Sequence, residues 1–399
     1  MVSLIKDRVY GRLDMSQDLE DNELMDVIDE CVVEESRITM IPIRQRQELA
    51  ETVFNAIRRL DVLQDILEDD SITEIMINGK DNIFIERNGR IEKSGKVFDS
   101  DARLEDIAQK IAALSNRIVN ASVPIVDTRL ADGSRVCIIL PPVALNGPII
   151  TVRKFFEIPL TIEKLIELGS VNTEVAAFLE KAVKAKYNLF ISGGTGSGKT
   201  TFLNVLSNFI PKDERIVTIE DSAELQLKNV ENIVRLEARN ANVEGKNAIT
   251  IRDLIKASLR LRPDRIIVGE VRGEETLDMI QAMSTGHDGS LSTGHGNSPE
   301  DMMARLETMV LMGMDMPVSA VRQQIASAID IIVHLGRLRD KSRRVLKIVE
   351  ITGIENGEIA FNTLYEFKET GEEGGKVQGG LVRVAENLKN TEKMQRAGY

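Results

Sequence analysis

Residues 193–200 carry the pattern G-x-x-x-x-G-K-[ST], with Gly193, Gly198, Lys199 and Thr200 at the specified positions. Glycines let backbone N–H groups close around phosphate oxygens, a lysine ammonium reaches the β- and γ-oxygens, and a threonine hydroxyl can ligate Mg²⁺. The pattern predicts binding of a nucleoside triphosphate, with ATP and Mg²⁺ as cofactors. The predicted nucleotide-binding loop consists of Gly193, Gly194, Thr195, Gly196, Ser197, Gly198, Lys199, Thr200 and Thr201.

A Walker-type ATPase also needs acidic groups that hold the metal ion and orient the attacking water. One candidate segment is an apolar strand pattern, residues 216–219, followed by Glu220, Asp221 and Glu224. In parallel sheets, ligands bind at the carboxyl ends of the strands, which favours a site role over solvated turn residues. We therefore predict Glu220 and Glu224 as catalytic residues.

The second candidate segment, residues 265–270, is a buried-strand pattern that ends in Glu270. Glu270 is predicted to hold the Mg²⁺ shell or to activate water, and the alternative is a surface carboxylate paired with Arg272. The predicted catalytic residues are then Lys199, Glu220, Glu224 and Glu270, and the predicted Mg²⁺ ligands are Thr200, Glu220 and Glu270. Sequence alone does not rank Glu220 against Glu270 as general base.

Two of the three histidines, His287 and His295, lie in a loop rich in Gly, Ser and Thr at residues 284–299. The loop has no third metal ligand at a useful spacing, so a zinc site is disfavoured. A γ-phosphate sensor or a subunit contact is the preferred interpretation, and both histidines are assigned to the nucleotide site together with Arg272.

The elements that must position these residues follow from the apolar patterns. Between residues 189 and 335, strand and helix patterns alternate, which is typical of a mainly parallel sheet with crossover helices. Before this region, period-two patterns with Asn-Gly turns and a helix near residues 104–118 predict an α+β domain. The predicted organisation is a helical segment at 1–67, an α+β domain at 68–156, a linker at 157–170, a RecA-like α/β ATPase domain at 171–369 and a flexible tail at 370–399.

Composition excludes several classes of protein. The 399 residues carry 63 acidic and 51 basic side chains, a formal charge of −12, and no Trp. Nucleic-acid binding proteins usually have a basic face and aromatic side chains for stacking, so direct nucleic-acid binding is not expected. No apolar run reaches the ~18 residues of a membrane helix, and Cys31 and Cys137 form no C-x-x-C pair, so a cytoplasmic protein without a transmembrane segment is expected.

The motifs together resemble a known superfamily. The loop at 193–200, residues 218–224, residues 261–273 and residues 285–298 look like the Walker A, Asp box, Walker B and His box of the ATPases of type II and type IV secretion and type IV pilus assembly. Residues 286–298 and 75–79 most resemble the CpaF-type ATPases of tight-adherence (Flp) pili. The resemblance covers residues ~60 to 365. No tetracysteine zinc motif of the type II secretion branch is present.

The resemblance implies a homo-hexameric ring that acts on an inner-membrane platform protein and associates with the membrane through such partners. It also implies that Arg135 and Arg153 reach the nucleotide, whereas a solvated sheet face is the alternative for these side chains. Arg260 and Arg262 are also assigned to the nucleotide site, as a contribution from a neighbouring subunit or from the same chain, and the sequence does not decide between the two. Gly294 and Gly296, where the family often has larger residues, are expected to loosen the His box.

Three functional hypotheses follow from these observations. The first is a hexameric motor that uses ATP hydrolysis to assemble pilin subunits or to drive the related type II secretion. The second is a type IV secretion traffic ATPase. The third is a nucleotide-dependent scaffold without turnover, against which the complete set of carboxylates argues.

Overall fold

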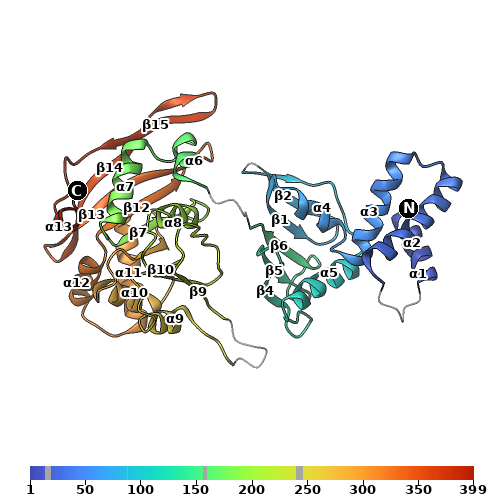
Figure 1. The fold of residues 1–399 in the computed structure, drawn as a ribbon, viewed down its shortest axis with the longest axis horizontal. Helices are drawn as coiled ribbons and strands as arrows, with labels where there is room; N and C mark the ends of the chain where they lie inside the picture. Colours follow the sequence, from blue (N-terminus) through green and yellow to red (C-terminus); the bar gives the residue numbers. More distant parts are fainter. Residues whose placement is uncertain (14–18, 88, 156–159, 240–245) are drawn as a thin grey trace. The chain divides into compact units, whose positions relative to one another are not determined.

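The computed structural model describes residues 1–13, 19–87, 89–155, 160–239 and 246–399. These residues form two compact units, residues 1–156 and residues 157–399 (Figure 1). The predicted linker begins at residues 157–159, which lie outside the described part. Its later residues form the short helix α6, Ile162–Glu167, whose Leu165 is buried in the second unit.

The first unit begins with a helical bundle. Its helices are α1 (Val2–Arg12), α2 (Asp21–Thr39), α3 (Ile43–Arg58) and α4 (Val62–Glu68). Apolar residues at helical spacing, among them Ile28 and Val53, meet in a small core between α1, α2 and α3. Pro42 is the residue that precedes α3, where a proline cannot continue the preceding helix.

A six-stranded antiparallel sheet with the strand order β3-β2-β1-β6-β5-β4 completes the first unit. Helix α5, Asp101–Leu114, packs its apolar face on this sheet, with Leu104, Ile107 and Ile111 in the shared core. The strands are β1 (Ile72–Asn78), β2 (Ile83–Arg87), β3 (Arg90–Lys93), β4 (Ile125–Arg129), β5 (Arg135–Ile139) and β6 (Ile149–Arg153).

The described part of the second unit is built on a nine-stranded sheet with the order β15-β14-β13-β12-β7-β11-β10-β8-β9. The strands from β12 to β9 in this order run parallel, and β13, β14 and β15 add an antiparallel edge. The strands are β7 (Leu189–Gly193), β8 (Ile216–Glu220), β9 (Ile233–Glu237), β10 (Arg265–Val268), β11 (Leu291–His295), β12 (Ile331–Arg337), β13 (Arg343–Glu355), β14 (Glu358–Glu373) and β15 (Lys376–Arg383).

Helices cover both faces of the parallel part of this sheet, which is why its strands read as continuous apolar runs. One apolar core includes residues of α7 and α8, and another includes residues of α9 to α12. The helices are α7 (Thr173–Lys184), α8 (Lys199–Ser207), α9 (Ile251–Ser258), α10 (Glu275–Ser284), α11 (Pro299–Gly313), α12 (Val318–Ala328) and α13 (Glu392–Arg396). The predicted α/β fold class, an ATPase-type sheet preceded by an α+β domain, is confirmed.

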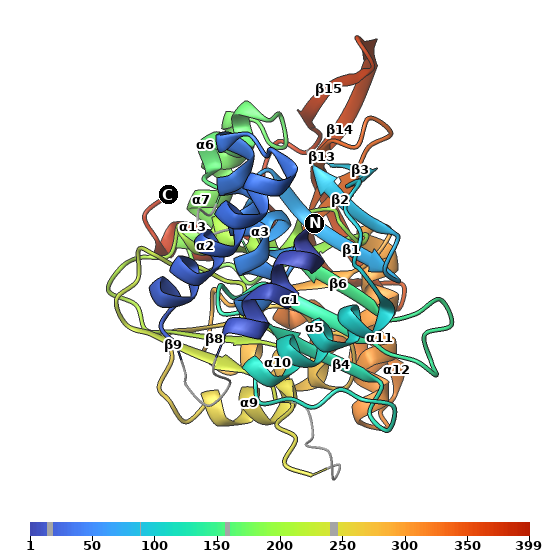
Figure 2. The same ribbon diagram turned by 90° about the vertical axis from the view of Figure 1, so that its right-hand side faces the viewer.

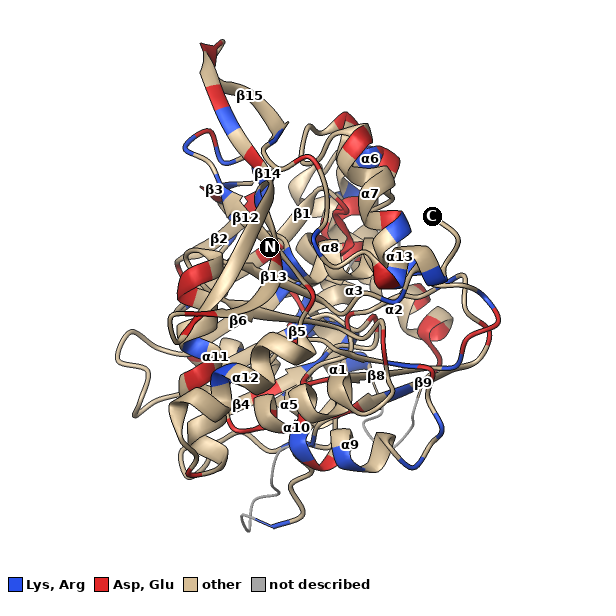
Figure 3. Cartoon of the chain, turned by 90° about the vertical axis from the view of Figure 1, so that its left-hand side faces the viewer, with Lys and Arg blue, Asp and Glu red and all other residues tan. Residues whose placement is uncertain are grey.

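The C-terminal residues differ from the prediction of a flexible tail at 370–399. Strands β14 and β15 form a long hairpin that projects from the sheet (Figure 2), and α13 follows it. Acidic and basic residues alternate along the outer part of the hairpin (Figure 3), and Arg339 pairs with Glu369 and Glu372 there. Gly374 and Gly375 form the turn of this hairpin, and both residues have positive φ.

The last residues also bind to the body of the second unit. The Glu350 carboxylate, which has no exposed surface, accepts hydrogen bonds from the backbone N–H groups of Lys389 and Asn390 at 2.8 and 2.6 Å. The Tyr187 hydroxyl donates to the carbonyl of Asn390 at 2.6 Å. Lys393 forms an ion pair with Asp330 at 2.7 Å. These polar contacts, together with Leu388 and Met394 packed against the apolar core, fix the segment on the second unit.

Candidate nucleotide site

The glycine-rich loop connects the end of β7 to the start of α8, as its motif predicts. Gly196 and Gly198 have φ values of 71° and 93°, in the left-handed region that glycine enters without a Cβ penalty. A Cβ on Gly193 would lie 2.5 Å from the carbonyl oxygen of Leu335 on the neighbouring strand β12. The loop therefore needs glycine at these positions for its backbone path, and it ends at the N-terminus of α8.

Lys199 is the first residue of α8 and is largely buried. Its Nζ donates to the carbonyl oxygens of Gly193 and Gly194, both at 3.2 Å, and lies 3.1 Å from Nδ1 of His295. The ammonium is thus held directly over the loop that the sequence assigned to phosphate binding.

His295 links Lys199 to the predicted carboxylate Glu270. Its Nε2 lies 2.7 Å from Oε1 of Glu270, whose other oxygen pairs with Arg272 at 2.6 Å. Burial, followed by the nearby Lys199 charge, lowers the pKa of His295, so the ring is neutral in neutral solution. A neutral ring between an ammonium and a carboxylate can accept a hydrogen bond on one nitrogen and donate on the other.

Glu220 occupies a different environment at the end of β8. Its Oε2 accepts hydrogen bonds from the backbone N–H groups of Glu224 and Leu225 at 2.7 and 3.0 Å, and the residue is buried. A Cβ on Gly269, one residue before Glu270, would lie 3.0 Å from Cγ of Glu220. Glu220 therefore fixes the loop that contains Glu224. The Glu220 side chain also lies beside Gly269, at the strand end that carries Glu270.

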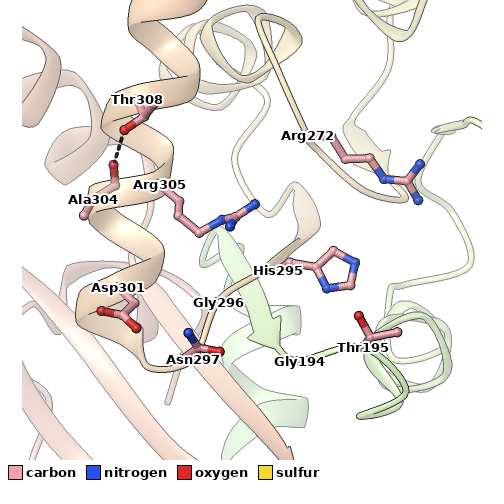
Figure 4. Close-up of a pocket in the computed structure, with 10 residues that line it drawn as sticks. All are labelled: Gly194, Thr195, Arg272, His295, Gly296, Asn297, Asp301, Ala304, Arg305 and Thr308. Carbon is pink, nitrogen blue, oxygen red and sulfur yellow. Dashed lines mark hydrogen bonds between the residues drawn. The ribbon is translucent and has the colours of Figure 1, made fainter.

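A pocket of about 720 Å³ opens beside the glycine-rich loop (Figure 4). The loop contributes Gly194 and Thr195 to its lining, His295 and Arg272 contribute side chains, and α11 contributes Arg305. Asp301, Ala304 and Thr308 lie on the same helix, and Gly296 and Asn297 complete the lining. Arg305 extends from its helix toward the pocket, which adds a cation that sequence reasoning missed.

The loop and its neighbours fit ATP and Mg²⁺. A Cβ on Gly194 or Gly196 would meet no atom within 4 Å, so there is open space next to the backbone where a phosphate chain would lie. The described residues contain no cluster of three or more His, Cys, Asp or Glu side chains that could hold a metal ion. Mg²⁺ usually keeps several waters and binds few protein ligands plus phosphate oxygens. Thr200, Glu220 and Glu270 stay the predicted Mg²⁺ ligands.

Three predicted nucleotide ligands lie elsewhere in their own chain. His287 precedes β11, and Arg260 and Arg262 precede β10, so all three lie at the amino ends of parallel strands. The glycine-rich loop lies at the carboxyl end of the neighbouring strand β7, at the opposite edge of the sheet. Strand direction therefore places all three away from the glycine-rich loop of their own chain. A contact with the nucleotide of a neighbouring chain stays a prediction.

Arg135 and Arg153 belong to the first unit. Strand register places them directly opposite each other on β5 and β6, and Arg129 on β4 is opposite Arg135. Three neighbouring strands thus carry a row of arginines at one end of the sheet. Their predicted contact with nucleotide remains a prediction.

The third histidine, His334, was not singled out from the sequence. It is buried on β12, and its Nδ1 lies 2.9 Å from Oγ of Ser192, the residue before Gly193. Burial lowers the pKa of His334, so it is a neutral hydrogen-bonding residue of the sheet. No local motif marks it, because the contact depends on the pairing of β12 with β7.

The His box is also tighter than expected. A Cβ on Gly294 would lie 2.9 Å from Cε of Met302 and from Cζ of Phe190, and one on Gly296 would lie 3.1 Å from Cβ of Met302. The two glycines let α11 approach β11 closely, so they do not loosen this segment.

Comparison with known proteins assigns the family. A family model described as type II/IV secretion system protein matches residues 58–398. The chain belongs to this family. Among relatives of this secretion-system protein, a putative conjugal transfer protein of Mycobacterium tuberculosis is 34% identical over 301 residues, which cover 74% of this chain and 85% of the relative. The type IV secretion system protein VirB11 of Brucella abortus is 30% identical over 303 residues, with coverage of 69% and 84%.

A solved structure shares the fold of this secretion-system protein. The X-ray structure of the Legionella pneumophila ATPase DotB aligns with a TM-score of 0.52 and 23% identity, and covers 72% of this chain and 78% of that one. Within the described residues, none of the helices combines the length and the apolar character needed to span a bilayer.

Proposed function

We propose that this secretion-system protein is an ATPase that converts ATP hydrolysis into movement of a secretion or pilus-assembly machine. The observation that carries the proposal is the contact series from Lys199 through His295 to Glu270 at the glycine-rich loop. Lys199 would neutralise the β- and γ-phosphates, Thr200 and Glu270 would hold Mg²⁺, and Glu270 would orient the attacking water. His295 would register the γ-phosphate, because it contacts both charged groups.

The test is release of phosphate from ATP by the purified chain, compared with the variant Lys199→Ala. Hydrolysis by the variant is expected to fall to background with its fold intact, because the ammonium is lost from the phosphate site. Lys212→Ala is the matched control, since Lys212 is an exposed lysine of the same unit. Equal turnover in wild-type protein and Lys199→Ala would refute the proposed site, and binding of ATP without any turnover would favour the scaffold.

A ring of six chains is part of the proposal. Shared motifs and the row of arginines on β4, β5 and β6 support it, since a phosphate chain with several negative charges needs cations beyond Lys199 and one metal ion. Light scattering should then give a mass near six times 44.4 kDa in the presence of ATP and Mg²⁺. A monomer under all nucleotide conditions would refute the ring.

Two machines are candidates for the work that the ATPase drives. The motif at residues 286–298 favours assembly of a tight-adherence pilus of the CpaF type, acting on an inner-membrane platform protein at the cytoplasmic face. The identity to proteins named for conjugal transfer and type IV secretion favours a traffic ATPase. A chromosomal Lys199→Ala strain separates them, because loss of surface pili with normal transfer of cargo supports the first, and the reverse supports the second.

A further inference from the structure

The turn between α2 and α3 exposes apolar side chains on the helical bundle of the first unit. We call residues 36–47, which contain this turn, the bundle tip. Ile38, Met40 and Ile43 are 68%, 87% and 80% exposed, so three large apolar side chains face solvent within six residues. Scattered apolar residues are normal on surfaces, but a group at one turn marks a contact site for a membrane or a partner.

The backbone of the bundle tip holds these side chains outward. Ile41, in the middle of the turn, is buried and anchors it to the bundle. The Nε of Arg46 donates to the carbonyl oxygen of Ile41 at 3.0 Å, and Met40 has a left-handed φ of 52°. One apolar residue of the turn thus enters the core, and the flanking Met40 and Ile43 are directed away from it. This arrangement presents apolar surface on a defined turn.

The charge of the bundle tip is opposite to that of the whole chain. It contains Arg37, Arg44 and Arg46, and the sequence has no acidic residue between Glu35 and Glu48. The complete chain, in contrast, has a formal charge of −12. Arg37 and Arg44 are exposed, and neither forms an ion pair with another described residue. The exposed apolar group is therefore flanked by basic side chains on both sides of the turn.

We propose that the bundle tip binds directly to a bilayer that contains anionic lipids. Apolar side chains that enter the boundary between headgroups and acyl chains, flanked by arginines at the level of the phosphates, are the two elements of interfacial binding. Each basic residue near such a surface adds roughly 1 kcal/mol of attraction. The charge complementarity favours a lipid surface over an apolar protein groove.

This contact goes beyond the proposed function, in which the membrane is reached through a platform protein. One bundle tip inserts only three apolar side chains, so a single copy should bind weakly and reversibly. Several copies at the same end of an oligomer would bind with a higher apparent affinity, without any new contact. The contact itself needs neither nucleotide nor turnover, so its test is independent of the proposed ATPase activity.

The experiment is co-sedimentation of the full chain with vesicles of phosphatidylcholine, with and without 30% phosphatidylglycerol. Wild-type protein is expected to bind the anionic vesicles and to be released by high salt. The variant with Ile38→Ser, Met40→Ser and Ile43→Ser should lose at least tenfold in bound fraction, and so should the variant with Arg37→Glu and Arg44→Glu. Matched controls are Leu145→Ser, at a residue that is 91% exposed in the same unit, and Arg90→Glu with Lys93→Glu.

Thermal unfolding of each variant checks that the substitutions leave the fold intact, as expected for exposed positions. Wild-type protein that does not bind anionic vesicles, or that binds neutral vesicles equally well, overturns the proposal. Retained binding by either bundle-tip variant overturns it too. If the serine variant changes only the oligomeric mass, the bundle tip is an interface between copies of the chain and the lipid proposal is wrong.

Discussion

Substitution of Glu220 should lower the stability of the protein, whereas substitution of Glu270 should lower its turnover, although the sequence does not distinguish the two residues. Glu220 is buried, and one of its oxygens accepts two backbone hydrogen bonds from the following loop. A hydrogen bond to a charged group contributes about 1.5–3 kcal/mol, so Glu220→Ala should lower the free energy of unfolding by about 3–6 kcal/mol. Glu220→Gln should cost less, because both bonds end on the same oxygen and an amide oxygen can accept them.

For Glu270 we expect the opposite result, a loss of turnover with little change in stability. Its partner Arg272 has a side chain that is 60% exposed, and such ion pairs contribute only about 0–1 kcal/mol. Glu270→Gln should therefore leave the stability nearly unchanged. If Glu270 orients or activates the attacking water, kcat should fall by about 10²–10⁴-fold, because general-base catalysis acts in the transition state. Nucleotide affinity should change little.

Two measurements on each variant separate these cases. Thermal unfolding reports stability, and for a unit the size of residues 157–399 a loss of 1 kcal/mol lowers the midpoint by roughly 2–4 °C. Phosphate release reports turnover, with fluorescent nucleotide binding as the check on the site. A large fall in the unfolding midpoint for Glu270→Gln, or a fully stable Glu220→Ala that has lost only turnover, would refute this division of roles.

Three further predictions follow from the contacts described above. Glu350→Gln should destabilise the second unit by about 2–5 kcal/mol and expose residues 384–399 to protease, because an amide nitrogen would then face a backbone N–H donor. The control is Glu386→Gln, at an exposed position of the same segment. Equal protease resistance of the Glu350→Gln variant and the wild-type protein would contradict the docking. The unfolding free energy should fall as pH decreases from about 6.5, because burial lowers the folded-state pKa of His334 and the unfolded chain binds the proton first. The contribution of His334 to this slope is at most about 1.4 kcal/mol per pH unit, and it should be absent in His334→Gln. An unchanged slope in that variant would contradict this prediction. Mixing Arg153→Ala chains with Lys199→Ala chains should restore ATPase activity if Arg153 acts across a subunit interface, whereas full turnover of both Arg135→Ala and Arg153→Ala would remove the first unit from the active site.

The sequence predicted the parts of the site that depend on local patterns. The glycine-rich loop, the strand that enters it and the helix that leaves it lie within one short segment, so motif and apolar pattern suffice. Glu270 was also predictable, because the buried strand ends at Val268, two residues before Glu270. The direction of the parallel strands could further have shown that Arg260, Arg262 and His287 precede their strands, which places them at the other edge of the sheet.

Other features depend on contacts between distant segments and were therefore not predictable. The glycine content of residues 370–399 suggested disorder, but Val377 is fully buried and its carbonyl accepts a hydrogen bond from Arg344 at 2.9 Å. The acceptor that fixes the last residues, Glu350, is on β13 and looks in sequence like any strand carboxylate. Burial of such a group is stabilising only because backbone N–H donors from another segment meet it.

The C-terminal strands are part of the nucleotide site, since they support the glycine-rich loop. Strand β12 pairs with β7, and its Leu335 carbonyl lies where a side chain on Gly193 would be. Strand β13 begins at Arg343, whose Nε donates to the carbonyl of Gly196 at 2.8 Å across 147 residues of sequence. The same strand carries Glu350, which binds the last segment of the chain. A loop that is recognised from eight residues thus keeps its conformation through strands near the C-terminus. Truncation there should weaken nucleotide binding even though every motif residue is retained.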